Sequence, residues 1–168
     1  MSIVIGNPKL GSRTRKAAEL VYSALRGTEP THAIELVELG PGLLGWGDPA
    51  VKNAVEQVQS SSFVIFASPT FKATYTGLLK LFLDQFSGGT GLHDVVAVPL
   101  MLGADSQHQL ATEVHLKPVL AELGAITTSP GLFLRDTTFE TDGSIEAYAE
   151  RWAPAIQDAV AGAQGRRA

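Results

Sequence analysis

Apolar residues follow two different periods along this chain, and each period predicts one type of secondary structure. Short continuous apolar runs, bounded by glycine, proline or serine, are typical of strands that are buried on both faces. Longer segments with apolar residues three or four positions apart are typical of amphipathic helices. Strands are predicted at residues 2–5, 33–39, 63–67 and 95–102, with shorter strand pieces at 125–128 and 132–134. Helices are predicted from residue 12 to a C-cap at Gly27, and at residues 49–59, 76–86, 107–123 and 145–163.

Five strands therefore alternate with five helices. This order predicts an α/β protein in which a parallel sheet carries helices on both faces and is connected by right-handed crossovers. We expect the strand order 2-1-3-4-5 within a single domain over residues 1–168, with residues 162–168 as a frayed tail. Ligands of such sheets bind outside the carboxyl ends of the strands. The loops at residues 6–14, 68–75 and 103–108 are therefore the expected site.

Composition narrows the classes of function. The 168 residues are 45% hydrophobic and 18% charged, which suits one well-packed domain and argues against disorder. A net charge of −4 gives no support for nucleic-acid binding. The chain has no cysteine, which excludes disulfides, thiolate nucleophiles and cysteine-ligated metals. The first residues lack the features of a signal peptide, and no apolar run is long enough for a membrane span. We expect a cytoplasmic protein.

The first loop has the character of a phosphate site. It joins a buried strand to a helix, whose free backbone N–H groups favour an anion. It also supplies hydroxyl groups and positive charge, from Ser12, Thr14, Lys9, Arg13 and Arg15. The two glycines fit the spacing of a nucleoside-triphosphate loop, but Ser12 and Arg13 replace its Lys-Ser/Thr pair, and G-x-G-x-x-G is absent. A monophosphate fits better, and a simple N-capping serine beside solvated basic residues is the structural alternative.

The second loop, at residues 68–77, has the character of a platform for a flat ring. Backbone amides beside a proline and aromatic residues can hold the edge of a heteroaromatic ring. The same amides and Lys72 can stabilise negative charge on a reduced ring. The alternative is an ordinary strand–turn–helix whose aromatic residues belong to the core.

The segment from Ser68 to Asp84 resembles the signature of the NADPH-dependent FMN reductase family. It is similar above all to the flavin reductases of two-component alkanesulfonate and methanesulfonate monooxygenase systems, which carry Ser-Pro-x-aromatic-Lys-Ala-x-aromatic-Ser/Thr-Gly. The likeness extends over residues 2–134 and includes 12–14, 108–111 and 116–120. Asn7 departs from the pattern, because serine is common at that position.

The resemblance implies a flavodoxin-like three-layer sandwich and hydride transfer from NADPH or NADH to FMN, with the reduced flavin passed to a partner monooxygenase. It implies a homodimer or homotetramer, with Tyr75 and the start of the third helix at a subunit interface. It implies no catalytic acid or base, only an electrostatic role for Lys72. The implied phosphate ligands are Asn7, Ser12, Arg13 and Thr14. The implied ring contacts are Pro69, Thr70, Phe71, Lys72, Gly103, Ala104, Asp105 and Ser106.

Pro118 lies inside the fourth predicted helix. A proline there removes one hydrogen bond and frees the carbonyl of Val114, which predicts a kink or a π-bulge. The sulfonate-system reductases resemble this chain in having an extra residue at that point, at a subunit interface, and Val114 or His115 would occupy it. His108 and His115 are interpreted as surface or interface histidines, because no set of metal-ligating partners accompanies them.

Other functions stay open at this stage. One alternative is an enzyme that keeps FMN tightly bound and reduces quinones or azo dyes, and it predicts a yellow protein. Another is a flavodoxin-like electron carrier without NAD(P)H activity, although such carriers are usually more acidic than this chain. A response-regulator-like module would need an acidic cluster at the strand ends, which the sequence lacks.

Overall fold

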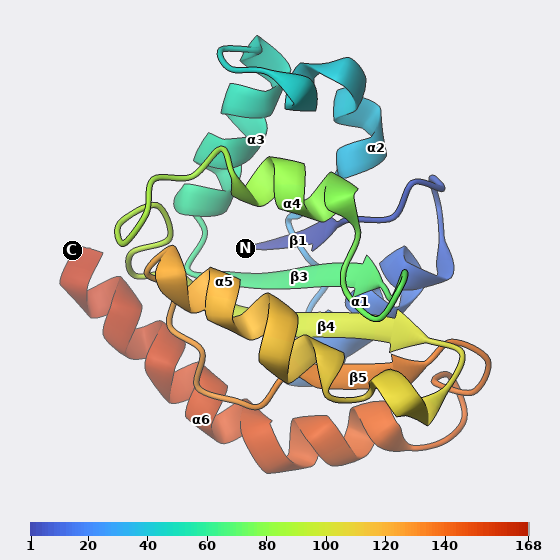
Figure 1. The fold of residues 1–168 in the computed structure, drawn as a ribbon. Helices are drawn as coiled ribbons and strands as arrows, with labels where there is room; N and C mark the ends of the chain where they lie inside the picture. Colours follow the sequence, from blue (N-terminus) through green and yellow to red (C-terminus); the bar gives the residue numbers. More distant parts are fainter. Residues whose placement is uncertain (168) are drawn as a thin grey trace.

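The computed structural model describes residues 1–167 and contains a five-stranded parallel sheet (Figure 1). The strand order is β2-β1-β3-β4-β5, and every neighbouring pair is parallel. The predicted order and fold class are therefore confirmed. The strands are β1 (Ser2–Ile5), β2 (His32–Glu35), β3 (Phe63–Pro69), β4 (Val96–Gly103) and β5 (Leu132–Arg135).

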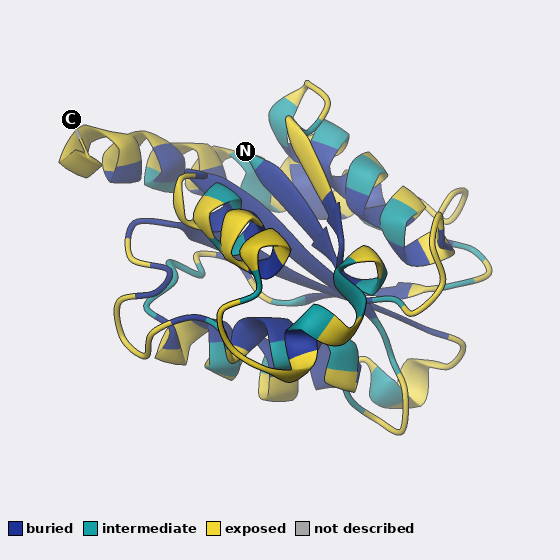
Figure 2. Ribbon diagram, turned by 90° about the horizontal axis from the view of Figure 1, so that it is seen from above, coloured by how far each residue is buried: buried dark blue, intermediate teal, exposed yellow. Residues whose placement is uncertain are grey.

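Helices cover both faces of the sheet and form the outer two layers. On one face lie α1 (Arg13–Arg26) and α6 (Ser144–Arg167), and on the other α3 (Pro49–Gln59), α4 (Gly77–Leu83) and α5 (Lys117–Glu122). Successive strand residues alternate between the two cores, so Ile3 and Ile5 pack with α1 and Val4 packs on the opposite side. Figure 2 shows buried strands between helices whose outward faces are exposed.

The second strand is shorter than the prediction of residues 33–39. It pairs in register with β1 only from His32 to Glu35, because β1 ends at Ile5 and its chain then turns into the first loop. Beyond Glu35 the backbone has no strand to pair with. The apolar residues that follow pack at helical spacing instead, in the short helix α2 (Leu36–Leu39) and the 3-10 turn η1 (Gly40–Leu44).

The predicted helix at residues 107–123 is divided into three pieces. It consists of a 3-10 turn, η2 (Ser106–His108), a π-helical turn, η3 (Thr112–Leu116), and α5. The N–H of Lys117 donates to the carbonyl of Thr112, five residues earlier, which is the π-helical pattern. The π-bulge predicted from Pro118 is therefore confirmed. The strand piece predicted at 125–128 is reduced to one bridge between Val96 and Ile126.

The C-terminal segment corrects another prediction, since residues 162–167 are an ordered part of α6 rather than a frayed tail. Arg166 Nε lies 2.6 Å from Asp94 Oδ1, and Arg167 donates to the carbonyls of Ser60 and His93. These contacts attach the end of the helix to the amino-terminal edge of the sheet. The last residue of the predicted tail, 168, lies outside the described residues. Within residues 1–167, no helix combines the length and apolarity needed to cross a membrane.

Candidate functional site

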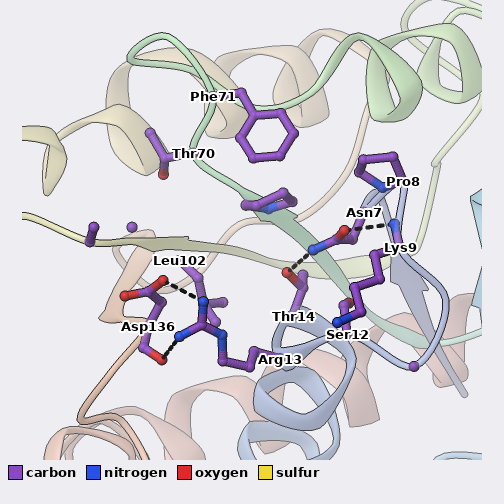
Figure 3. A pocket seen from close by; sticks show the side chains of 14 residues that line it. Asn7, Pro8, Lys9, Ser12, Arg13, Thr14, Thr70, Phe71, Leu102 and Asp136 are labelled. Atoms are coloured by element: carbon purple, nitrogen blue, oxygen red, sulfur yellow. Dashed lines mark hydrogen bonds and ion pairs between the residues drawn. The ribbon is translucent and has the colours of Figure 1, made fainter.

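A cavity of about 580 Å³ lies at the carboxyl ends of the strands, between loops that follow β1, β3, β4 and β5 (Figure 3). It is lined by Asn7, Pro8, Lys9, Gly11, Ser12, Arg13, Thr14, Pro69, Thr70, Phe71, Leu102, Gly103, Ala104 and Asp136. Nine of the twelve residues that the sequence singled out as ligand contacts are in this set. The three outside it are Lys72, Asp105 and Ser106. The fold thus gathers segments that are far apart in the sequence, from Asn7 to Asp136, into one site.

The first loop leaves β1 at Gly6, where any larger residue would have to displace Leu79 of α4. A β-carbon at Gly6 would lie 2.7 Å from Cβ of Leu79 in α4, so only glycine allows this close approach. The N–H of Gly6 donates to the carbonyl of Ala67 (2.8 Å), and the hydroxyl of Thr76 donates to the carbonyl of Gly6 (2.6 Å). The loop therefore begins from a rigid point between β3 and α4.

The same loop ends on the N-terminus of α1. Gly11 has a φ of +61°, a left-handed conformation that turns the chain into the helix. Ser12 is the N-cap, and its Oγ accepts from the N–H of Arg15 at 3.4 Å. The first N–H groups of a helix have no acceptor within the helix, so this end of α1 presents donors and positive potential to the cavity. Such a terminus suits a phosphate.

Hydrogen bonds of Asn7 join the start of the first loop to Thr14 in the first turn of α1. Asn7 Nδ2 donates to Thr14 Oγ1 (2.9 Å), and Asn7 Oδ1 accepts from the N–H of Lys9 (2.9 Å). Because Thr14 Oγ1 already accepts one hydrogen bond, its own proton is available to a ligand in the cavity. Asn7, the residue that departs from the family pattern, thereby orients a hydroxyl group.

Arg13 is held by a residue that the sequence analysis did not identify. Its guanidinium donates to Oδ2 and to the carbonyl oxygen of Asp136, both at 3.0 Å (Figure 3). Asp136 directly follows β5, so the rule that placed the other loops at the strand ends could have found it. The described residues place no carboxylate within ion-pair distance of Lys9, whose side chain reaches toward Ser12 in Figure 3.

The second loop forms a tight hairpin beside the cavity. The N–H of Phe71 donates to the carbonyl of Thr74 (2.8 Å), and the N–H of Thr74 donates back to Phe71 (3.3 Å). Lys72 and Ala73 between them have φ angles of +53° and +69°. Non-glycine residues in this region cost about 1–3 kcal/mol each, and such strain is concentrated at functional sites. The hairpin leaves Phe71 half exposed over the cavity and carries Lys72 to the tip, outside the lining.

The third loop closes the remaining wall through a second crowded glycine. A β-carbon at Gly103 would lie 2.7 Å from Cζ of Phe133 and 3.4 Å from Oγ1 of Thr70. That Thr70 oxygen is buried and has no hydrogen-bond partner in the described structure. A buried hydroxyl without a partner is costly, so it is a natural contact for a polar ligand. Asp105 instead accepts from the N–H of Gln107 and caps η2, which explains its place outside the cavity.

The sheet order, the helix layers and a cavity at the carboxyl ends of the strands define a flavodoxin-like α/β protein. A family model described as NADPH-dependent FMN reductase matches residues 1–140. The chain belongs to the NADPH-dependent FMN reductase family, and its activity is the reduction of FMN with NAD(P)H. The family resemblance drawn from the sequence is therefore confirmed.

Individual relatives agree with this assignment. The chain is 33% identical to an FMN reductase (NADPH) of Escherichia coli K12 over 136 residues, which are 79% of this chain and 71% of the relative. It is 26% identical to the NADH-dependent FMN reductase SfnF of Pseudomonas fluorescens over 138 residues, 76% and 72% of the two chains. Among solved structures, apo NADH:FMN oxidoreductase EMOB superimposes with a TM-score of 0.77 and 29% identity, over 96% of this chain and 89% of that one.

Proposed function

We propose that this enzyme takes FMN as an exchangeable substrate, reduces it with NAD(P)H and releases the reduced flavin to a partner monooxygenase. One observation supports the exchange of FMN. The cavity has a polar, donor-rich end at α1, but at its other end Phe71 is 51% exposed, so nothing among the described residues encloses a flat ring. The partner is inferred from the resemblance of residues 68–84 to the reductases of two-component systems.

In this proposal the phosphate of FMN binds at the first loop. The N-terminus of α1 supplies backbone N–H groups, and Ser12 and Thr14 supply hydroxyl donors. Lys9 and Arg13 supply positive charge, which strengthens hydrogen bonds to a phosphate. Asn7 contributes by orienting Thr14. The geometry thus supports all four phosphate ligands expected from the sequence and adds Lys9 to them.

The isoalloxazine ring binds between the second and third loops. Pro69, Thr70 and Phe71 form one wall, and Gly103 and Ala104 form the other. The unpartnered hydroxyl of Thr70 fits a polar edge of the ring. The absence of a side chain at Gly103 lets Phe133 pack directly behind this wall of the cavity. When bound, FMN supplies the hydride-accepting chemistry, while the protein positions the ring and excludes other geometries.

Lys72 has a narrower role in this proposal than the sequence indicated. From the hairpin tip it acts on the ring through its electric field and not by direct contact. Asp105 and Ser106 are left out of the contact set, since Asp105 is engaged at the start of η2. Reduction needs no side chain that is a nucleophile or a general acid, because hydride transfer is the chemistry of the nicotinamide and the flavin.

We also propose that the enzyme is a homodimer or homotetramer. Two groups of exposed apolar side chains support association. One lies on and just before the π-helical turn η3, where Val114 is 55% and Leu110 is 66% exposed. The other lies beside α4, where Leu44 and Trp46 are about three-quarters exposed. The first group includes Val114, one of the two alternatives for the extra residue that the family resemblance places at an interface. Tyr75, which the resemblance also places there, lies two residues before α4 and is only half-buried.

The test is NADPH and NADH oxidation by flavin-free protein, with and without added FMN, alongside FMN binding and light scattering for the oligomer. Colourless protein whose turnover saturates with added FMN supports an exchangeable substrate. Tightly bound yellow FMN, with turnover only in the presence of a quinone or dye, would favour a bound-flavin reductase. FMN binding without NAD(P)H oxidation would contradict the reductase activity itself.

A further inference from the structure

We propose that Glu35 is a positioning residue that holds the phosphate loop in its binding conformation from outside the cavity lining. The inference rests on the proposed phosphate site. Glu35 is the last residue of β2 and is paired in register with Ile5, the last residue of β1. Its side chain is therefore placed beside the point where the phosphate loop leaves the sheet. It does not line the cavity and is not part of the sequence-based site.

Among the described residues Glu35 makes two polar contacts, one to the end of the loop and one to the first turn of α1. Its Oε1 accepts from the N–H of Gly11 at 3.2 Å and lies 3.5 Å from Nη1 of Arg15. Gly11 is the left-handed residue directly before the N-cap Ser12. Fixing the N–H of Gly11 therefore fixes where the Ser12 hydroxyl and the first N–H groups of α1 point.

The burial of this carboxylate is expensive. Its side chain is 1% exposed, and Oε2 is buried without any partner among residues 1–167. A buried carboxylate that is incompletely hydrogen-bonded loses solvation that its contacts do not fully replace. An apolar residue would close the end of an edge strand at lower cost. What the carboxylate adds is the pair of contacts to Gly11 and Arg15.

The contact with Arg15 has a second consequence. The Arg15 guanidinium lies between Glu35 and Glu19, whose Oε1 is 2.8 Å from Nε. The hydrogen bond to Glu19, assisted by the charge of Glu35, raises the pKa of Arg15. This arrangement keeps Arg15 out of the cavity lining, so its charge interacts with Glu19 and Glu35 and not with a ligand. Positive charge for the phosphate is left to Lys9 and Arg13.

The experiment compares dissociation constants of FMN and riboflavin, which differ by the phosphate, measured by quenching of flavin fluorescence. Glu35→Ala removes the acceptor and is expected to weaken FMN binding about tenfold while riboflavin binding changes less than twofold. Glu35→Gln keeps an oxygen that can accept from Gly11 and is expected to restore most of the affinity. Glu35→Asp keeps the charge but is too short, and is expected to resemble the alanine variant.

A matched control is Glu113→Ala. Glu113 also accepts from a glycine N–H, that of Gly131 at 2.6 Å, and pairs with Lys117, but it lies outside the cavity. It is expected to lose stability without changing the ratio of FMN to riboflavin affinity. If Glu35→Ala does not fold, the contrast between the glutamine and aspartate variants decides the question.

Three results would overturn the inference. Equal losses for FMN and riboflavin would show a general structural role. Tighter FMN binding in both the alanine and glutamine variants would show that Glu35 acts as a repelling charge. An unchanged FMN preference in Glu35→Ala would show that the loop does not need it. If wild-type protein itself binds both flavins equally, the proposed phosphate site fails instead.

Discussion

Replacing Ser12 with alanine removes a hydroxyl that both caps α1 and faces the cavity. The cap is a long hydrogen bond of 3.4 Å to the N–H of Arg15, so its loss is expected to cost about 0.5–1 kcal/mol, at the low end for N-caps. For a chain of this size that corresponds to a decrease in Tm of about 1–4 °C. A hydrogen bond to a charged phosphate contributes about 1.5–3 kcal/mol. FMN affinity is therefore expected to fall about 10- to 150-fold.

The assay separates these two effects with riboflavin and with a second N-cap. Riboflavin lacks the phosphate, so Ser12→Ala is expected to bind it as wild-type protein does. Asp48 caps α3 through bonds of 2.9 and 3.1 Å to the N–H groups of Ala50 and Val51, far from the cavity lining. Asp48→Ala is expected to lose about 1 kcal/mol of stability with no change in FMN affinity.

The reasoning is refuted if Ser12→Ala loses stability but still binds FMN within twofold of wild type. The hydroxyl would then serve only the helix. A parallel loss of riboflavin affinity would also refute it, because the effect would not depend on the phosphate.

Three further predictions concern the strained and charged positions. Ala73→Gly relieves a left-handed alanine and, after the entropy of glycine in the unfolded chain is subtracted, is expected to stabilise by about 0.5–1 kcal/mol in urea denaturation; a loss of stability would contradict the strain. Gly103→Ala places a β-carbon against Phe133 and is expected to weaken FMN and riboflavin binding alike, so a loss confined to FMN would argue against a ring contact. The hydrogen bond from Arg166 lowers the pKa of Asp94, so this pair stabilises the fold above the unfolded pKa near 3.8 and ceases to do so as the pH falls through the folded value. Thermal melts of wild type and Asp94→Asn are therefore expected to differ at pH 6 and to converge only as the pH falls below about 3.8, through the lowered pKa of Asp94, and a constant difference would exclude the linkage.

Most of the fold could be predicted because its determinants are local. The runs of apolar residues in β1, β3 and β4 need burial on both faces, and that need is visible in each segment by itself. The caps at Ser12, Asp48 and Gly27 form hydrogen bonds within a few residues, so residue type alone indicates them. Alternation and crossover handedness then limit the strand orders to a few, of which 2-1-3-4-5 is one.

The errors in the predicted fold concern elements that depend on a partner distant in the sequence. The end of β2 is set by the length of its partner strand β1, whose last residue, Ile5, pairs with Glu35. The apolar residues that continue past Glu35 do not extend the strand. The order of residues 162–167 depends on Asp94 and on two carbonyl groups that the last helix reaches only after the sheet has formed.

The sequence by itself determined the fold class, the family and the three loops that meet at the cavity, because strand patterns, caps and a signature segment are written in consecutive residues. Tertiary structure decided which charges act in the site. It paired Arg13 with Asp136 across 123 positions, placed Glu35 against Gly11 of the phosphate loop and left Lys72 outside the lining. The physical reason is that pairing and burial depend on distances of a few ångströms between elements, which are set only when the sheet and helices have packed.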